Sequence, residues 1–211
     1  EPLTIRDEYS RFLLDITGMN KHSIDRVKDR FRACFEKYGL PKYMRSDNGS
    51  PFAAVASLCG LTRLSAWWIK LGIIPNRIPL ASPHCNGSHE RMHADMYREF
   101  ELCPALDLLE QQKLIDRWKT EFNFERPHEA LNMETPSECY SPSSRSYDSK
   151  EPEYAYPSSF RVFKVDGNGA IHWTKRKLPL TLALAHESVG IETLSDSALR
   201  IWYCDFWLGD T

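Results

Sequence analysis

Two acidic side chains in short polar stretches are the residues best suited to chemistry in this chain. Asp47 lies in RSDNGSP, residues 45–51, and Glu90 lies in SPHCNGSHERMH, residues 82–93. Asp47 follows a short predicted strand, and the Asn-Gly pair after it tolerates the positive φ of a sharp turn. Glu90 is predicted on the first turn of a helix that begins near Asn86. Two carboxylates on separate elements suit Mg²⁺ or Mn²⁺, which prefer oxygen ligands, although Asp47 alone also fits an ordinary surface turn.

The same helix start also fits a zinc site from a different reaction class. His89, Glu90 and His93 match H-E-x-x-H, in which two histidines bind Zn²⁺ and the glutamate acts as a general base. That motif fixes only three positions. Pro83 and Gly87 place His89 near the helix start, whereas in a zinc protease the helix would already have begun before this histidine. A zinc metallohydrolase is therefore the less favoured alternative. Its further ligands could come from His84, Cys85, Glu110 and Glu121.

The elements that would position these carboxylates are strands and helices in alternation. Trp67 and Trp68 lie in one of the helices. They could stack on DNA bases, but aromatic residues at helical spacing favour a buried core position. The expected elements are a hairpin over 1–19 with a polar loop at 7–10, helices over 23–39 and 61–71, strands over 42–45 and 73–78, and helices from 86 and from 104 to 122.

The last third of the chain has a different pattern. Residues 133–158 are rich in Pro, Ser, Tyr and charge without periodicity, which is typical of a linker. The short apolar runs after it predict a small all-β barrel. Lys175, Arg176 and Lys177 form the densest basic run there and are candidate phosphate contacts, or else a solvated loop. The expected strands cover 160–165, 170–173, 178–184, 189–194 and 199–204.

Composition narrows the possible partners and the cellular compartment. The net charge of -2 is not that of a protein coated with basic residues, so any DNA contact must come from a local patch. The 6 cysteines are scattered and include no C-x-x-C pair, which predicts reduced thiols in a cytosolic protein. No secretory signal or apolar run of about 18 residues is present, so no membrane partner is expected. Because residue 1 is Glu and a strand begins at once, we expect the chain to start inside a longer one.

Several short runs together resemble the integrase core of DDE transposases and retroviral-type integrases, with one bacterial insertion-sequence group the most similar. The resemblance covers residues 1 to about 147 in the expected order, and no single run would suffice alone. The matching runs are PLT at 2–4, DEYSR at 7–11, SDNG at 46–49, LGI at 71–73, Pro83 with Asn86 and Gly87, ERMH at 90–93, and Asn123 with RPHEAL at 126–131.

This resemblance implies a fold and a domain division. Residues 1–140 would form a ribonuclease H-like α/β core without its first strand, 141–157 a linker, and 158–211 an SH3-like β-barrel. It also implies three carboxylates, Asp, Asp and Glu, that hold two Mg²⁺ (or Mn²⁺) ions for phosphodiester cleavage and strand transfer. Asp47 matches the second carboxylate and Glu90 the third. The strand that would carry the first is not in this chain, so the chain is expected to be impaired in strand transfer.

The remaining expectations concern partners. The resemblance implies DNA, both element ends and target, as the substrate, a homo-oligomer assembled on it, and a cytoplasmic, nucleoid-associated bacterial location. Arg91 suits a phosphate contact because its guanidinium is a fixed fork of donors. Arg126 would be either a DNA contact or a salt bridge at a capped helix end. A non-catalytic, DNA-binding transposase remnant is the alternative to an active enzyme. The residues expected around the DNA are Asn48, Asn86, Arg91, His93, Arg126, Lys175, Arg176 and Lys177.

Overall fold

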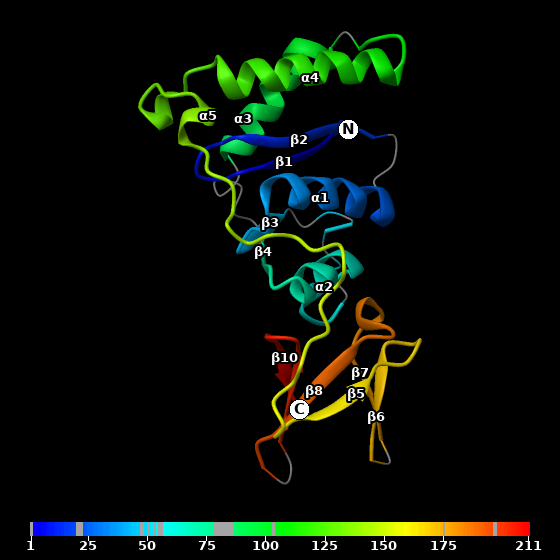
Figure 1. The fold of residues 1–211 in the computed structure, drawn as a ribbon. Helices are drawn as coiled ribbons and strands as arrows, with labels where there is room; N and C mark the ends of the chain where they lie inside the picture. Colours follow the sequence, from blue (N-terminus) through cyan, green and yellow to red (C-terminus); the bar gives the residue numbers. More distant parts are fainter. Residues whose placement is uncertain are drawn as a thin grey trace. The chain divides into compact units, whose positions relative to one another are not determined.

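In the computed structural model the chain forms two compact units (Figure 1). Unit 1 comprises Glu1–Gly39 and Ala81–Tyr147, and unit 2 comprises Leu40–Leu80 and Asp148–Thr211. The domain boundaries expected from the sequence stay a prediction. The described residues are 2–19, 23–46, 49, 51, 52, 54, 57–77, 87–102, 104–174, 176–195 and 198–211.

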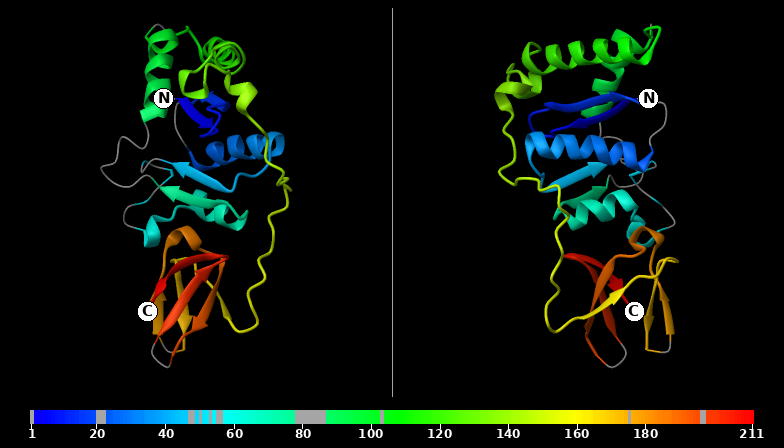
Figure 2. Two further views of the ribbon diagram at one scale, coloured as in Figure 1. Left: turned by 90° about the vertical axis from the view of Figure 1, so that its left-hand side faces the viewer. Right: turned by 45° about the vertical axis from the view of Figure 1, so that its right-hand side comes forward.

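Unit 1 is built on an antiparallel hairpin that lies between two helices. Strands β1 and β2 pair from Pro2 opposite Gly18 to Ile5 opposite Asp15, with a bulge after Ile5. Figures 1 and 2 show α1 on one side of this hairpin and α4 on the other. The elements are β1 (Pro2–Arg6), β2 (Leu13–Gly18), α1 (Ile24–Tyr38), α3 (Gly87–Met96), the π-helical η3 (Tyr97–Glu101), α4 (Leu108–Phe124), η4 (Glu129–Leu131) and α5 (Pro136–Cys139).

Local signals in the sequence explain where α1 begins and ends, as expected. Ser23 is extended, and its hydroxyl accepts a hydrogen bond from the Arg26 amide. Gly39 ends the helix with a φ of 79°, a left-handed value that favours glycine. A Cβ at Gly39 would lie 2.6 Å from the Ser143 carbonyl oxygen, so the chain after α5 packs directly on this turn. The Ser143 amide also donates to the Tyr38 carbonyl at 2.9 Å.

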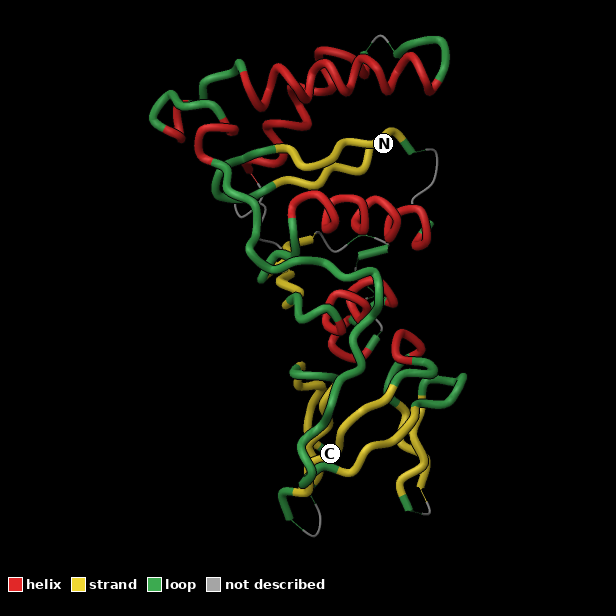
Figure 3. The backbone as a smooth tube through the Cα atoms, in the orientation of Figure 1, coloured by secondary structure: helices red, strands yellow, loops and turns green. Residues whose placement is uncertain are grey.

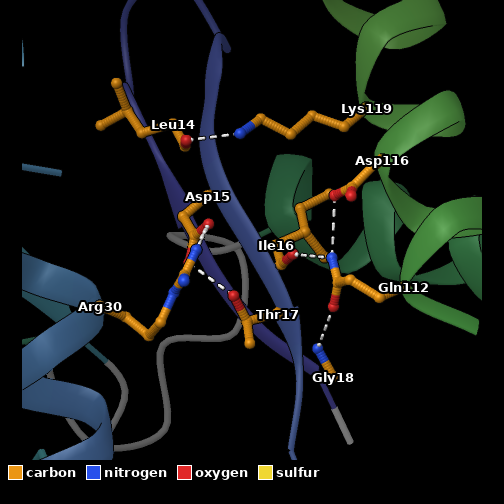
Figure 4. Close-up of polar contacts among 9 residues, drawn as sticks. All are labelled: Leu14, Asp15, Ile16, Thr17, Gly18, Arg30, Gln112, Asp116 and Lys119. Carbon is orange, nitrogen blue, oxygen red and sulfur yellow. Dashed lines mark hydrogen bonds and ion pairs between the residues drawn. The ribbon is translucent and has the colours of Figure 1, made fainter. Parts of the chain in front are cut away.

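Two side chains of α4 close the outer edge of β2 (Figure 4). Gln112 donates from Nε2 to the Ile16 carbonyl at 2.9 Å and accepts from the Gly18 amide at 3.1 Å. Lys119 donates from Nζ to the Leu14 carbonyl at 2.6 Å, and burial lowers the pKa of its amine. An unpaired strand edge can template aggregation, and these bonds satisfy edge groups that a neighbouring strand would otherwise pair.

Buried polar contacts fix the start and the middle of β2. Asn123 is 1% exposed; its Oδ1 accepts from the Leu13 amide at 2.8 Å and its Nδ2 donates to the Leu13 carbonyl at 3.0 Å. Asp15 is 5% exposed and accepts from Arg30 Nε on α1 at 2.9 Å and from Thr17 Oγ1 at 2.9 Å. Polar groups on both neighbouring helices therefore hold the strand. The apolar core of this unit contains Leu13, Ile16, Met92, Met96, Phe100, Ile115, Trp118 and Phe122.

Unit 2 joins a parallel strand pair to a C-terminal sheet. Strands β3 and β4 pair from Tyr43 opposite Ile74 to Ser46 opposite Arg77, and α2 lies between them in the sequence. Parallel strands need such a crossover, so this segment is the expected strand–helix–strand unit. The elements are β3 (Tyr43–Ser46), η1 (Leu58–Gly60), α2 (Arg63–Lys70), β4 (Ile74–Arg77), β5 (Arg161–Lys164), β6 (Ala170–Trp173), β7 (Arg176–Pro179), η5 (Leu182–Leu184), β8 (Ser188–Thr193), β9 (Leu199–Tyr203) and β10 (Phe206–Asp210).

The helix α2 contributes to the core of unit 2. Thr62 caps it, since its hydroxyl accepts from the Ser65 amide at 3.2 Å. Trp67 and Trp68 are 4% and 1% exposed, which confirms the core interpretation over base stacking. Side chains of the α2 region and of the C-terminal strands share one apolar cluster. It contains Leu61, Ala66, Ile69, Val165, Ile171, Leu184, Val189, Ile191, Ile201, Tyr203, Cys204 and Leu208.

The C-terminal strands do not confirm the expected closed SH3-like barrel. In the described part of the chain, β10, β9, β8 and β5 form a four-stranded antiparallel sheet in that order, and β6 and β7 form a separate hairpin (Figure 3). The strand expected over 178–184 was partly wrong, because η5 occupies Leu182–Leu184. A further strand, β10, follows the last predicted one.

An aromatic segment before β5 lies on one face of this sheet. Tyr156 donates from its hydroxyl to the Ser188 carbonyl at 2.8 Å and accepts from the Cys204 amide at 3.0 Å. Gly190 leaves room for its ring, since a Cβ there would lie 2.4 Å from Tyr156 and 2.9 Å from Phe160. The residues on either side of Gly190 are fully buried in the apolar cluster, so Tyr156 and Phe160 cover the opposite face.

Candidate functional site

The helix α3 presents Glu90 to solvent, as the sequence predicts. The helix begins at Gly87, and both Glu90 and Arg91 are exposed on its first turns. Within the described part of the chain, neither side chain has a hydrogen bond or an ion pair. Two consecutive helix positions therefore carry a carboxylate and a guanidinium that have no partner among the described residues. A free carboxylate can ligate a cation and a free guanidinium can contact a phosphate.

The opposite face of α3 fixes the helix to the rest of unit 1. Met92, Met96 and Phe100 are 2%, 0% and 4% exposed and belong to the core that includes β2 and α4. His93 lies between the faces, and its Nε2 is 3.2 Å from the Thr4 hydroxyl on β1. His93 thus helps to hold α3 against the hairpin, and its expected place near the DNA stays a prediction.

Four of the expected site residues, Asp47, Asn48, Asn86 and Lys175, lie outside the described residues. The strand that precedes Asp47 is β3 of unit 2, whereas Glu90 is on α3 of unit 1. Among the residues that the structure describes, no three His, Cys, Asp or Glu side chains form a group that could hold a metal ion. Glu90 fits one ligand of a magnesium site, because Mg²⁺ is commonly held by one or two carboxylates plus substrate phosphates.

The zinc alternative receives little support from the described ligands. His93 Nε2 is already beside Thr4. Glu110 Oε1 accepts from Lys113 at 2.8 Å, and Glu121 Oε1 accepts from Arg126 at 2.8 Å. His84 and Cys85 lie outside the described residues, and the side chain of His89 is not described.

Arg126 lies in a network of two carboxylates and one indole. Its Nη2 donates to Glu99 Oε1 and to Glu121 Oε1, both at 2.8 Å, and its Nε donates to Glu121 at 3.2 Å. The guanidinium carbon also lies 5.6 Å from the Trp118 ring centroid. This is the salt bridge at a helix end that the sequence offered as one interpretation of Arg126, and a DNA contact by Arg126 stays a prediction. Sequence reasoning missed Glu99.

The expected basic residues of unit 2 lie on an exposed strand. Arg176 and Lys177 are exposed on β7. The Lys177 ammonium is 3.0 Å from Asp166 Oδ2. Arg176 pairs across the hairpin with Trp173, and the guanidinium carbon of the exposed Arg161 lies 5.6 Å from the Trp173 ring centroid. The sequence reasoning missed Arg161, which adjoins the basic run only through the strand arrangement.

No helix, over the ranges given above, is long and apolar enough to pass through a membrane.

Sequence and structure comparisons place the chain among known proteins. Residues 71–136 match the family model described as integrase core domain. An uncharacterised protein of insertion element IS136 from Agrobacterium fabrum is 33% identical over 114 residues, which cover 54% of this chain and 54% of that protein. An uncharacterised 31.7 kDa protein of insertion element IS407 from Burkholderia multivorans is 29% identical over 140 residues, 64% of this chain and 47% of that protein. The chain spans about half the length of these curated relatives.

A solved structure is similar over nearly the whole chain. The cryo-EM structure of the simian T-cell lymphotropic virus intasome in complex with PP2A regulatory subunit B56 gamma matches with a TM-score of 0.50 and 13% identity. The match covers 98% of this chain and 75% of that one. At this identity the similarity supports the fold alone.

Proposed function

We propose, from the confirmed resemblance to the integrase core of insertion-sequence transposases, that this chain acts in DNA transposition as a DDE-type strand transferase. One observation carries the proposal. Glu90 lies inside the region that matches the integrase core, and it is an exposed carboxylate with no partner among the described residues, on a helix whose other face is packed. Buried structural carboxylates such as Asp15 are instead bonded to cations. Glu90 is therefore available for a ligand.

The chemistry would follow from a divalent cation shared by carboxylates. Asp47 and Glu90 would hold Mg²⁺ or Mn²⁺, which would activate the attacking water or DNA 3′-hydroxyl and stabilise the leaving oxygen. Arg91, exposed beside Glu90, would contact a phosphate of the bound strand. A third carboxylate, which the resemblance places on a strand before β1, would complete a two-ion site.

The finer features of the fold form part of the same proposal. The β1–β2 hairpin, α1, and the parallel β3–β4 pair follow the chain order of a ribonuclease H-like core. The sheet of β5, β8, β9 and β10 together with the β6–β7 hairpin would correspond to the SH3-like part. We infer that several copies assemble on the element ends, as a strand transferase that joins two ends requires.

The test is strand transfer on a labelled element end in Mg²⁺ or Mn²⁺. It should use this chain and a version extended upstream by its natural coding sequence. We expect Glu90→Gln and Asp47→Asn each to abolish transfer, while Glu125→Gln, an exposed acid after α4, leaves it unchanged. Activity that survives Glu90→Gln would exclude the proposed role. Tight Zn²⁺ binding that is lost in His89→Ala, with no transfer by either version, would favour the metallohydrolase.

A non-catalytic DNA-binding role is the second candidate, and the exposed basic residues of β5 and β7 favour it. The double variant Arg176→Ala/Lys177→Ala should reduce the slope of log affinity against log salt by about 1 to 2. The control Arg63→Ala removes an exposed charge from α2 in the same unit and should leave the slope unchanged. DNA binding with this salt dependence but without any strand transfer by the extended version would support the second candidate.

A further inference from the structure

We propose that Arg126 is a positioning residue that sets the orientation of Glu90 through Glu99. The inference rests on the proposed role of Glu90 as a metal ligand. It assigns to Arg126 a task inside the protein that builds on its salt bridges at the end of α4.

The geometry of the network links two helical elements. Glu99 lies in η3, and Glu121 lies in the last turns of α4. Arg126 Nη2 donates to both carboxylates at 2.8 Å, and a second bond to Glu99 measures 3.1 Å. These bonds share one guanidinium nitrogen, and Nε also donates to Glu121 Oε1 at 3.2 Å. One guanidinium therefore joins η3 to α4.

A shift at Glu99 is transmitted to Glu90 because α3 and η3 are continuous. The helix runs from Gly87 to Met96 and passes directly into the π-helical turn from Tyr97 to Glu101. In an ideal α-helix, a residue four positions further along lies about 40° around the axis from the first. A π-helical turn contains more residues, which reverses part of this rotation. Phe100 therefore stays on the same buried face as Met92 and Met96.

Contacts at the middle and at the C-terminal end of the rod formed by α3 and η3 fix its direction. The His93–Thr4 contact lies one turn from Glu90. At the C-terminal end, Arg126 stacks over Trp118, and the Trp118 ring meets the Phe100 ring edge-on at 5.8 Å between centroids. Arg126 thus supports η3 by an ion pair with Glu99 and by packing through Trp118.

Electrostatics explains why the arrangement needs a cation. Glu99 and Glu121 both approach the same Arg126 nitrogen, so without Arg126 the two negative charges would face each other. The side chains are 40%, 47% and 29% exposed respectively, so solvent screens much of the energy. We expect loss of Arg126 to rotate or loosen the rod without unfolding the unit.

The test is Mn²⁺ binding to the intact chain, measured by electron paramagnetic resonance, alongside the melting temperature. Orienting groups outside a metal's ligand set typically change its affinity about 10- to 100-fold. Arg126→Ala should weaken Mn²⁺ binding about 10-fold and Glu99→Gln less, while Arg126→Lys should be intermediate. Neutralising all three in Arg126→Met/Glu99→Gln/Glu121→Gln should recover part of the loss. The control Lys113→Ala, which breaks an exposed ion pair on α4, should change nothing.

The outcomes separate the two proposals. If Glu90→Gln binds Mn²⁺ like the unmodified chain, the proposed function fails. If binding depends on Glu90 but Arg126→Ala and Glu99→Gln match Lys113→Ala, only the positioning role fails. A general loss of structure would lower the melting temperature in proportion to the loss of binding. The positioning role predicts instead that Glu99→Gln, which keeps the Arg126–Glu121 bonds, weakens binding without that drop.

Discussion

Replacement of Asn123 by Leu should destabilise unit 1 more than any exposed substitution on α4. Asn123 is 1% exposed and makes both of its hydrogen bonds to the backbone of Leu13, at 2.8 and 3.0 Å. The leucine side chain has a similar size but leaves a buried N–H and a buried C=O without partners. Each unsatisfied group costs about 1–3 kcal/mol, so the expected loss is roughly 2–6 kcal/mol.

Native-state hydrogen exchange at the Leu13 amide measures this loss directly. The matched control is Thr120→Ala, one turn earlier on the exposed side of α4, which should change the opening free energy by less than about 0.5 kcal/mol. In Asn123→Asp, one oxygen can still accept from the Leu13 amide, but the other faces the Leu13 carbonyl and must carry a proton to donate. Folding should therefore raise the pKa of this carboxyl. The Asn123→Asp protein should then lose stability relative to the wild type as the pH rises. A change in Asn123→Leu no larger than that of the control would refute the reasoning.

Three further predictions concern other parts of the chain. Gly190→Ala should destabilise unit 2 by about 1–3 kcal/mol in urea unfolding, because its methyl group would collide with the Tyr156 ring. Burial and, after it, the charges of Arg11 and Arg126 lower the pKa of His128 below 6.5. The neutral imidazole therefore contributes its full stability above about pH 6.5, and this contribution is lost as the pH falls. In His128→Gln, the free energy of unfolding should depend less on pH between pH 5 and 7. Burial raises the pKa of the Cys34 thiol to about 12, so at pH 8 iodoacetamide should modify the exposed Cys59 before Cys34 in peptide mapping.

Much of the local structure could be predicted because its signals are local. Ser23 and Gly39 marked the ends of α1, and the apolar spacing around Trp67 and Trp68 marked a buried helix. These features depend on hydrogen bonds and packing within a few residues. The free carboxylate of Glu90 on a first turn was predictable for the same reason.

Features that depend on distant partners were not predictable. The contacts of Asn123 with Leu13 and of Arg126 with Glu99 join segments 110 and 27 residues apart, and no periodicity indicates such pairs. The strand β10 was missed because Cys204, with a φ of 51°, turns the chain without a glycine or proline to mark it. The expected strand over 178–184 failed because an apolar run also suits a short 3-10 turn that buries Leu184.

The proposal that Asp47 and Glu90 are both ligands of a divalent cation is tested most directly by iron-directed cleavage. Fe²⁺ bound in place of Mg²⁺, with ascorbate and peroxide, cuts the backbone next to its ligands. The account predicts two cuts, near residues 45–50 and 84–92. Excess Mg²⁺ should suppress both cuts, and either Asp47→Asn or Glu90→Gln should abolish both. Cleavage at only one position, or cleavage that persists at full strength in Mg²⁺, would contradict it.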